Sequence, residues 1–158
     1  MVLQRSGHRA WSAAIALLLA GFLVVGAGPA DADASPEKVG RRLQMVSLTN
    51  TARTAHDREA LAFQARISRY AKQHSRAMAE KGYIYHSTEE QLRAALGDVD
   101  WSLGGENVGV GGSLDGLQRA FMASKLHRQN ILNTTYDHVA IGVVRADDSL
   151  WVTVIFYG

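Results

Sequence analysis

Residues 139–156 read VAIGVVRADDSLWVTVIF, and this stretch decides the fold class. Its two outer runs, 139–144 and 150–156, are rich in β-branched and aromatic residues, and the polar run RADDS at 145–149 separates them. This pattern predicts a β-hairpin. The residues before it show helical spacing instead, so we expect a single α+β domain in which helices pack on a small antiparallel sheet.

The first predicted helix begins near Pro36. A proline that follows a serine, here Ser35, is typical of a helix start, because serine caps the helix and proline suits its first turn. Apolar residues then recur three or four positions apart, at Val39, Leu43 and Val46. This spacing is typical of a helix.

A second helix is expected to begin at Asp57 or Glu59. It should end at Gly82, because glycine readily adopts the left-handed backbone that closes a helix. The apolar stripe predicted for it, at steps of three and four, is Phe63, Ile67, Tyr70, His74 and Ala77 or Met78.

The segment 97–113 is rich in glycine and predicts turns around a short extended piece at 106–110. A short helix is expected before it, over 88–96, and a helix capped by Ser113 is expected after it. We do not interpret the glycines as a phosphate loop, because no Gly-Lys-Ser/Thr follows them. The sequence also lacks the G-x-S-x-G motif of serine hydrolases.

The first 34 residues predict a secretory signal peptide. Basic residues precede an apolar run over 11–26, and ADADA at 30–34 offers A-x-A cleavage sites. The apolar run is shorter than the ~20 residues of a membrane-spanning helix. An uncleaved signal anchor is the alternative. In either case this segment is the only expected membrane contact, and the domain formed by residues 35–158 would be secreted or extracellular.

Composition excludes several classes of chemistry. The 158 residues include no cysteine, which rules out disulfides, thiolate zinc sites and cysteine nucleophiles. The 17 Lys and Arg residues exceed the 15 Asp and Glu residues by two, and these charges are spread along the chain. No basic tract of the kind that nucleic-acid binding needs is present, so we expect no nucleic-acid partner.

His86, Glu106 and His127 are the candidates for chemistry. Two neutral imidazoles and a carboxylate can hold a zinc-like ion, or carry out acid–base work near neutral pH. Their separations form no local metal motif such as H-E-x-x-H. From the residues alone, the alternative remains open that they are three unrelated polar side chains in loops.

The other histidines and the aromatic residues have simpler interpretations. His74 lies on the apolar stripe of its helix and is expected to be a core histidine with one hydrogen-bond partner. His56 and His138 are expected to be solvated. Five aromatic residues are expected to pack in the core or hairpin, namely Trp101, Phe121, Tyr136, Trp151 and Phe156, and a ligand groove lined by some of them is the alternative.

Several segments match a known family in order and spacing. They are LTNTAR at 48–53, His86, ENV at 106–108, FMAS at 121–124, HRQNIL at 127–132 and VAIGV at 139–143. Together they resemble the CAP superfamily (cysteine-rich secretory proteins, antigen 5 and pathogenesis-related proteins), in its bacterial SCP-like extracellular branch. The resemblance covers about residues 40–158.

This resemblance implies a three-layer α-β-α sandwich with a cleft where His86, Glu106 and His127 meet. In this family the two histidines can hold a divalent metal, often zinc, beside an acidic residue. The chain departs from the pattern of the eukaryotic branch, since Phe121 takes the position of a tryptophan and Ser124 that of a second glutamate. Ala140 stands where the family usually has glycine, and we expect only a local packing adjustment there.

Three functions follow from these expectations. The first is a binding module whose cleft takes a small apolar ligand or a cell-envelope component, with or without a metal on His86 and His127. Tyr85, Trp101, Tyr136 and Trp151 could form the walls of its groove.

The second function is a hydrolase of peptide or cell-envelope substrates. His86 and His127 would hold the ion, and Glu106 would accept a proton or orient a histidine. The third is a structural or host-interaction protein in which these residues only support the fold.

Overall fold

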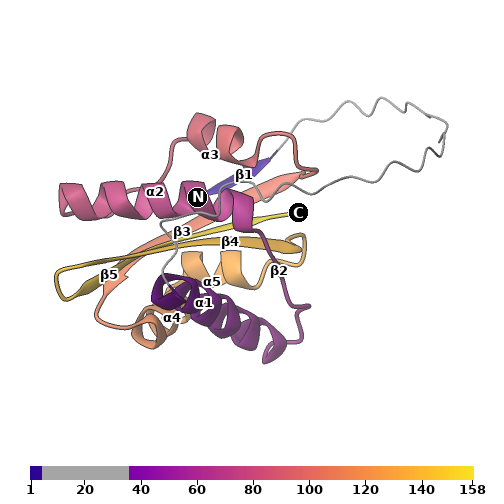
Figure 1. Cartoon of the computed structure of the whole chain (residues 1–158). Helices are drawn as coiled ribbons and strands as arrows, with labels where there is room; N and C mark the ends of the chain where they lie inside the picture. The colour runs from indigo at the N-terminus through magenta and orange to yellow at the C-terminus, as the bar shows by residue number, and fades with distance from the viewer. Residues whose placement is uncertain (5–35) are drawn as a thin grey trace, which may run out of the picture.

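The computed structural model describes residues 1–4 and 36–158. Over this part of the chain, the strands form one sheet in the order β1-β3-β5-β4-β2 (Figure 1). The strands are β1 (Val2–Gln4), β2 (Ala62–Phe63), β3 (Leu103–Gly111), β4 (His138–Ala146) and β5 (Ser149–Tyr157). The helices are α1 (Pro36–Thr54), α2 (Ala65–Lys81), α3 (Glu89–Leu96), α4 (Leu114–Ala123) and α5 (Lys125–Ile131). Most of the predicted signal peptide, and the predicted cap Ser35, lie outside the described residues.

The helices cover both faces of the sheet. Figure 1 shows α2 and α3 on one face, and α1, α4 and α5 on the other. The prediction of a three-layer α-β-α sandwich is therefore confirmed. One pairing departs from an all-antiparallel sheet, because the two-residue strand β2 runs parallel to β4.

The predicted hairpin is formed by β4 and β5, and it divides the core. Val139, Ile141 and Val143 pack toward α1, α4 and α5, whereas Ala140 belongs to the cluster formed with α2 and α3. Strand β5 alternates in the same way, because successive side chains of a strand point to opposite faces. The turn is tighter than the predicted segment 145–149, since Ala146 already pairs with Ser149.

Three details of the helix and strand predictions were wrong. Helix α2 starts at Ala65, and Phe63 lies in β2, because the chain first forms turns over residues 55–57 and then pairs with β4. The apolar spacing predicted for α1 matches its buried face only in part, because Val46 packs against the core, Leu43 is exposed and Met45, which lies outside that spacing, is buried. The extended piece predicted at 106–110 is a nine-residue strand, β3.

The ends of the helices follow the predicted local rules. Gly82 closes α2 with φ 74°, a left-handed conformation. Thr88 starts α3 with a capping box shared with Gln91, and Ser113 caps α4 through the Gly116 amide. The end of α2 and the start of α3 fix the two ends of the loop between them, which carries His86.

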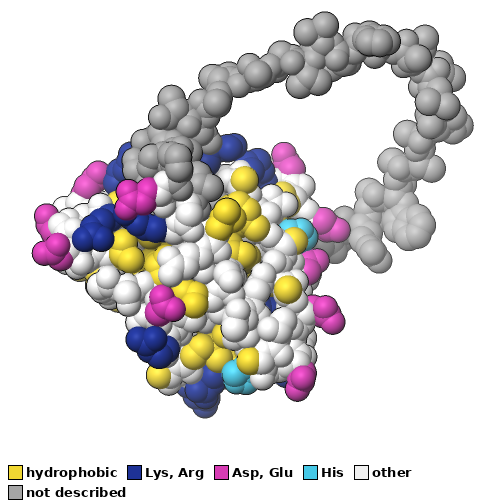
Figure 2. Space-filling model, turned by 60° about the horizontal axis from the view of Figure 1, so that its bottom comes forward, with side chains coloured by type: hydrophobic (Ala, Val, Ile, Leu, Met, Phe, Trp, Pro, Cys, Tyr) yellow, Lys and Arg dark blue, Asp and Glu magenta, His cyan; other side chains and the backbone are white. Residues whose placement is uncertain are grey.

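The surface on the side of α1, α4 and α5 mixes acidic, basic and apolar side chains (Figure 2). In the part of the chain that the structure describes, no helix is long and apolar enough to cross a membrane.

Candidate functional site

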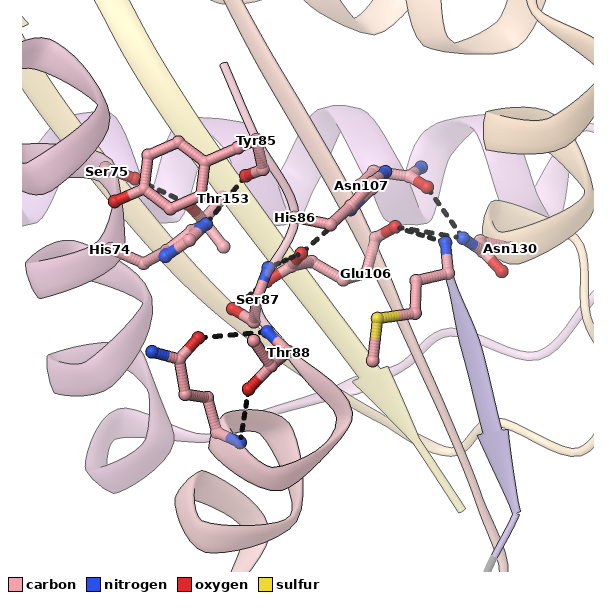
Figure 3. Close-up of polar contacts among 12 residues, drawn as sticks. His74, Ser75, Tyr85, His86, Ser87, Thr88, Glu106, Asn107, Asn130 and Thr153 are labelled. Atoms are coloured by element: carbon pink, nitrogen blue, oxygen red, sulfur yellow. Dashed lines mark hydrogen bonds and ion pairs between the residues drawn. The ribbon is translucent and has the colours of Figure 1, made fainter. Parts of the chain in front are cut away.

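The centre of the site is the carboxylate of Glu106, which is 0% exposed in the middle of β3. Its Oε1 accepts hydrogen bonds from His86 Nδ1 at 2.8 Å and from the Ser87 amide at 2.9 Å. Its Oε2 accepts one from the Ser87 hydroxyl at 2.6 Å (Figure 3). The carboxylate is thus held at both oxygens by two consecutive residues of one loop.

These contacts set the charge of Glu106. Burial by itself raises the pKa of the carboxyl group, but the hydrogen bonds from His86 and Ser87 outweigh it and hold the pKa below its usual value. The side chain is therefore ionised at neutral pH, and three donors replace the water that it has lost.

The loop that carries His86 is fixed by the residues around it. His74 Nε2 donates to the Tyr85 carbonyl at 2.9 Å, and the Tyr70 hydroxyl donates to Ser87 Oγ at 2.8 Å. His74 is buried with this hydrogen-bond partner, as its position on the apolar stripe predicted. Helix α2 therefore holds the site loop as well as packing on the sheet.

His127 lies on α5, on the opposite side of β3. Its backbone carbonyl accepts a hydrogen bond from Asn107 Nδ2 at 3.0 Å. Asn130 Nδ2 donates to Asn107 Oδ1 at 2.8 Å and to the Glu106 carbonyl at 3.2 Å. The imidazole packs on Phe121, with the ring centroids 5.0 Å apart. Asn107 and Asn130 thus join α5 to β3 next to Glu106.

The pKa of His127 is lowered, first by burial and then by the electrostatic effect of His86 and of the N-terminal amino group. Its imidazole is therefore neutral at pH 7 and can act as a ligand or a hydrogen-bond acceptor.

Of the three predicted site residues, the structure places two in direct contact and the third on another element. His86 and Glu106 are in direct contact on the α2–α3 side of the sheet, while His127 approaches from α5 on the other side. Four residues of the site were not predicted, namely Tyr70, Ser87, Asn107 and Asn130. Asn107 and Asn130 lie inside the matching segments ENV and HRQNIL. Their positions near Glu106 and His127 in these segments could have identified them as site residues from the sequence.

The fit of a metal can be judged from the donor atoms. His86 donates through Nδ1 to Glu106, which leaves Nε2 as the lone-pair nitrogen; a metal-binding histidine is commonly held in this way by a carboxylate. Across residues 1–4 and 36–158, no group of three or more His, Cys, Asp or Glu side chains is arranged to hold an ion. The described residues therefore offer two imidazoles, one from the α2–α3 loop and one from α5, but no complete set of metal ligands.

Aromatic residues divide between core and surface. Trp101, Tyr136 and Trp151, expected as groove walls, are at most 9% exposed and belong to the core clusters. Tyr85 is half-buried, and the residues before it, Tyr83 and Ile84, are 58% and 47% exposed. The apolar surface next to His86 is thus formed by the site loop itself.

The other two histidines lie outside the site. His56 is exposed, as expected, and its Nδ1 contacts the Ala52 carbonyl. His138 is only partly solvated, because its ring stacks on Tyr157 and its Nδ1 bonds to Asp137. The expectation of a solvated His138 therefore missed the aromatic ring that covers one of its faces.

Comparison with known sequences gives a consistent result. The sequence model of the cysteine-rich secretory protein family, CAP, matches residues 46–156. The chain is 28% identical over 114 residues to the uncharacterized protein YkwD of Bacillus subtilis. The matching region covers 68% of this chain and 44% of that protein. It is 31% identical over 108 residues to the uncharacterized membrane protein YlbC of the same organism, covering 65% of this chain and 31% of that protein.

Solved structures agree on the fold. An extracellular protein containing an SCP domain from Bacillus anthracis superposes with a TM-score of 0.65 at 26% identity, over 78% of this chain and 44% of that one. An outer surface protein of Borrelia burgdorferi has a TM-score of 0.65 at 20% identity, over 77% of this chain and 92% of that one. The chain thus spans less than half the length of the Bacillus proteins that it matches.

Proposed function

We propose that this chain, which belongs to the cysteine-rich secretory protein (CAP) family, is an exported binding module. It would bind a small apolar ligand or a cell-envelope component next to His86, Glu106 and His127. The proposal that the domain works outside the cell is supported by the predicted signal peptide, and by the extracellular and outer-surface proteins that share its fold.

The observation that carries the proposal is the arrangement of Glu106. A general base must present a lone pair to the proton that it removes. The Glu106 carboxylate is fully buried, and both of its oxygens already accept hydrogen bonds from His86 and Ser87. This geometry suits a group that orients the imidazole of His86, and it favours binding over the hydrolase in which Glu106 accepts a proton.

The apolar character of the ligand is supported by the loop beside His86. Tyr83 and Ile84 expose much of their side chains, and the Tyr83 and Tyr85 rings lie 5.6 Å apart. Exposed apolar side chains that adjoin a polar site are typical of a surface that binds a ligand.

A divalent ion is the proposed partner of the two histidines. When bound, it would supply a positively charged attachment point for a carbonyl or phosphate oxygen of the ligand. Glu106 would fix the orientation and tautomer of His86, and the neutral ring of His127 would offer the second nitrogen. Because zinc usually takes four ligands in structural sites, a two-histidine site should bind it weakly.

Calorimetry with zinc at pH 7.5 tests the metal. We expect binding that is lost in both His86→Ala and His127→Ala and kept in His56→Ala, since His56 is exposed away from the site. Unchanged zinc binding in the two site variants would contradict the proposed metal site.

The affinity should also fall as the pH drops below about 6, because imidazole binds metal only when neutral. The lowered pKa of His127 keeps this ring neutral, and so able to bind, at pH values below those at which a free histidine protonates. Calorimetric titrations at pH 7.5, 6.5 and 5 check it, and tight binding at pH 5 would be the opposite result.

A fluorescent fatty acid tests the ligand class. We expect saturable binding that weakens in Tyr83→Ser and Ile84→Ser. Leu43→Ser is the control, because Leu43 is a similarly exposed apolar residue on α1. Hydrolysis of peptide or cell-wall fragments by the wild-type chain, abolished in Glu106→Gln, would support the hydrolase instead.

A further inference from the structure

At the outer edge of β3, the chain pairs with its own first residues. Strand β1 runs antiparallel to β3, with Val2 opposite Gly105 and Leu3 opposite Gly104. Beyond this register, the Glu106 amide donates to the Met1 carbonyl at 2.9 Å, and the Met1 amino group donates to the Glu106 carbonyl at 3.4 Å. The strand therefore ends at the central residue of the candidate site.

Side chains of β1 alternate between solvent and a pocket. Val2 is 57% exposed and Gln4 is exposed, whereas Leu3 is only 6% exposed. Leu3 lies in the core cluster whose other members include Ile67, Leu92, Leu96 and Trp101. The edge of β3 thus offers backbone pairing together with a pocket for one apolar side chain.

Two further features suit this edge for a strand. Gly104 leaves room beside Leu3, since a Cβ on Gly104 would lie 3.2 Å from Leu96 Cδ1 and 4.0 Å from Leu3 Cβ. Arg93 Nη2 donates to the Gln4 carbonyl at 2.9 Å and so holds the other end of the segment. β3 also lacks proline and lysine, residues that discourage pairing at exposed sheet edges.

We propose that this edge of β3 is a docking site for an extended peptide that carries a large apolar side chain at the Leu3 position, and that residues 1–4 occupy it in the full-length chain. Pairing with a sheet edge supplies affinity through main-chain hydrogen bonds, and side-chain pockets supply selectivity. Because residues 1–4 fall within the predicted signal peptide, cleavage of that peptide would free the edge beside Glu106. The inference goes beyond the proposed function, because it requires neither a metal nor an apolar small molecule.

The first test asks whether the pocket for Leu3 keeps the segment in place. In the full-length chain, Leu3→Asp should accelerate hydrogen exchange of the Glu106 amide by at least about tenfold, because its partner is the Met1 carbonyl. Val2→Asp adds the same charge at an exposed position and should leave this rate unchanged. Leu3→Ala should act in the same direction more weakly. Amides shared by β4 and β5 report whether each variant remains folded.

The second test adds the peptide Met-Val-Leu-Gln-amide to the Leu3→Asp chain, with a chelator present to exclude metal. We expect saturable binding at millimolar or lower concentration and restored protection of the Glu106 amide. The peptide Met-Val-Asp-Gln-amide should not bind. Equal binding of both peptides, no binding of the first, or equal exchange rates in the Leu3 and Val2 variants would overturn the inference. None of these results depends on zinc or fatty-acid binding, so the proposed function is tested separately.

Discussion

At the scale of single residues, two buried charges have different roles. Glu106 fixes the loop of His86, as described above. Arg53 is 1% exposed and donates to four backbone carbonyls, those of Glu59, Ile131, Asn133 and Tyr136, at 2.7 to 3.2 Å. It thereby joins the end of α1 to the segment that follows α5.

Replacement of Arg53 by lysine should lower the free energy of unfolding by roughly 2–4 kcal/mol, because an ammonium group cannot reach carbonyls spread around a planar guanidinium. Arg145→Lys, at an exposed position, should change stability by less than about 0.5 kcal/mol. Urea unfolding monitored by circular dichroism compares them. A stability of Arg53→Lys equal to that of the wild type would show that the four bonds contribute little.

Glu106→Gln should destabilise the domain by about 2 kcal/mol at pH 7, since the buried ionised acceptor of three hydrogen bonds is lost. The pKa of Glu106 in the folded chain lies below the value of 4.5 that is usual for glutamate. Its stabilising effect is therefore complete above about pH 5 and is lost as the pH falls through the lowered pKa.

The stability difference between wild type and Glu106→Gln should accordingly shrink on acidification. Urea unfolding at pH 7 and pH 3 measures both differences. A gap that widened in acid would mean that the folded state prefers the protonated carboxyl group.

At the scale of elements, α2 packs directly on β4. A Cβ added at Gly142 would lie 2.1 Å from the Ala71 carbonyl carbon and 2.3 Å from the Lys72 amide nitrogen. No side-chain rotation relieves a clash with backbone, so only glycine allows this approach. The contact matters for the site, because α2 also carries Tyr70 and His74, which hold the His86 loop.

Gly142→Ala should therefore cost more than about 3 kcal/mol or prevent folding. Gly112→Ala is the matched control, because a Cβ there meets no atom within 4 Å. Thermal unfolding of the two variants separates them, and nearly equal melting temperatures would show that α2 can move away from the sheet at little cost.

The elements also show how far sequence reasoning reaches. The hairpin, the start of α3 and the end of α2 were predicted because their signals are local: β-branched runs, Thr88 with the acidic residues that follow it, and Gly82. The start of α2 was wrong because residues 62–63 join a sheet through β4, a partner distant in sequence. The strand β3 was underestimated because its glycines suggest turns, whereas Gly104, Gly105 and Gly109 are buried beside neighbouring side chains.

The site was predicted only in part. The choice of His86, Glu106 and His127 rested on the resemblance to a family, since their spacing forms no local motif. The direct contact of His86 with Glu106, and the bonds from Ser87, depend on how α2, α3 and β3 pack together. No periodicity of a single segment carries that information.

At the scale of the whole molecule, the two layers of helices share the same strands. The cluster with α1, α4 and α5 and the cluster with α2 and α3 both take residues from β4 and β5. Neither layer can lose its contacts without disturbing the sheet, so unfolding should be a single cooperative step.

Urea transitions followed by tryptophan fluorescence and by far-ultraviolet circular dichroism should therefore coincide. Trp101 and Trp151 report on the side of α2 and α3, whereas circular dichroism reports on all helices. Two separated midpoints would indicate that one layer unfolds before the other.

The position of β5 within the sheet also has a consequence for the timing of folding during synthesis. β5 lies between β3 and β4, yet it follows both of them along the chain. While the ribosome is still making residues 149–157, the two long strands already made have no common neighbour to pair with. Until then, β3 can pair only with the three-residue strand β1, and β4 only with the two-residue strand β2. For the export proposed above, this order of synthesis would keep the sheet unfinished, in a form that can still be threaded through a membrane channel, until the last strand is made.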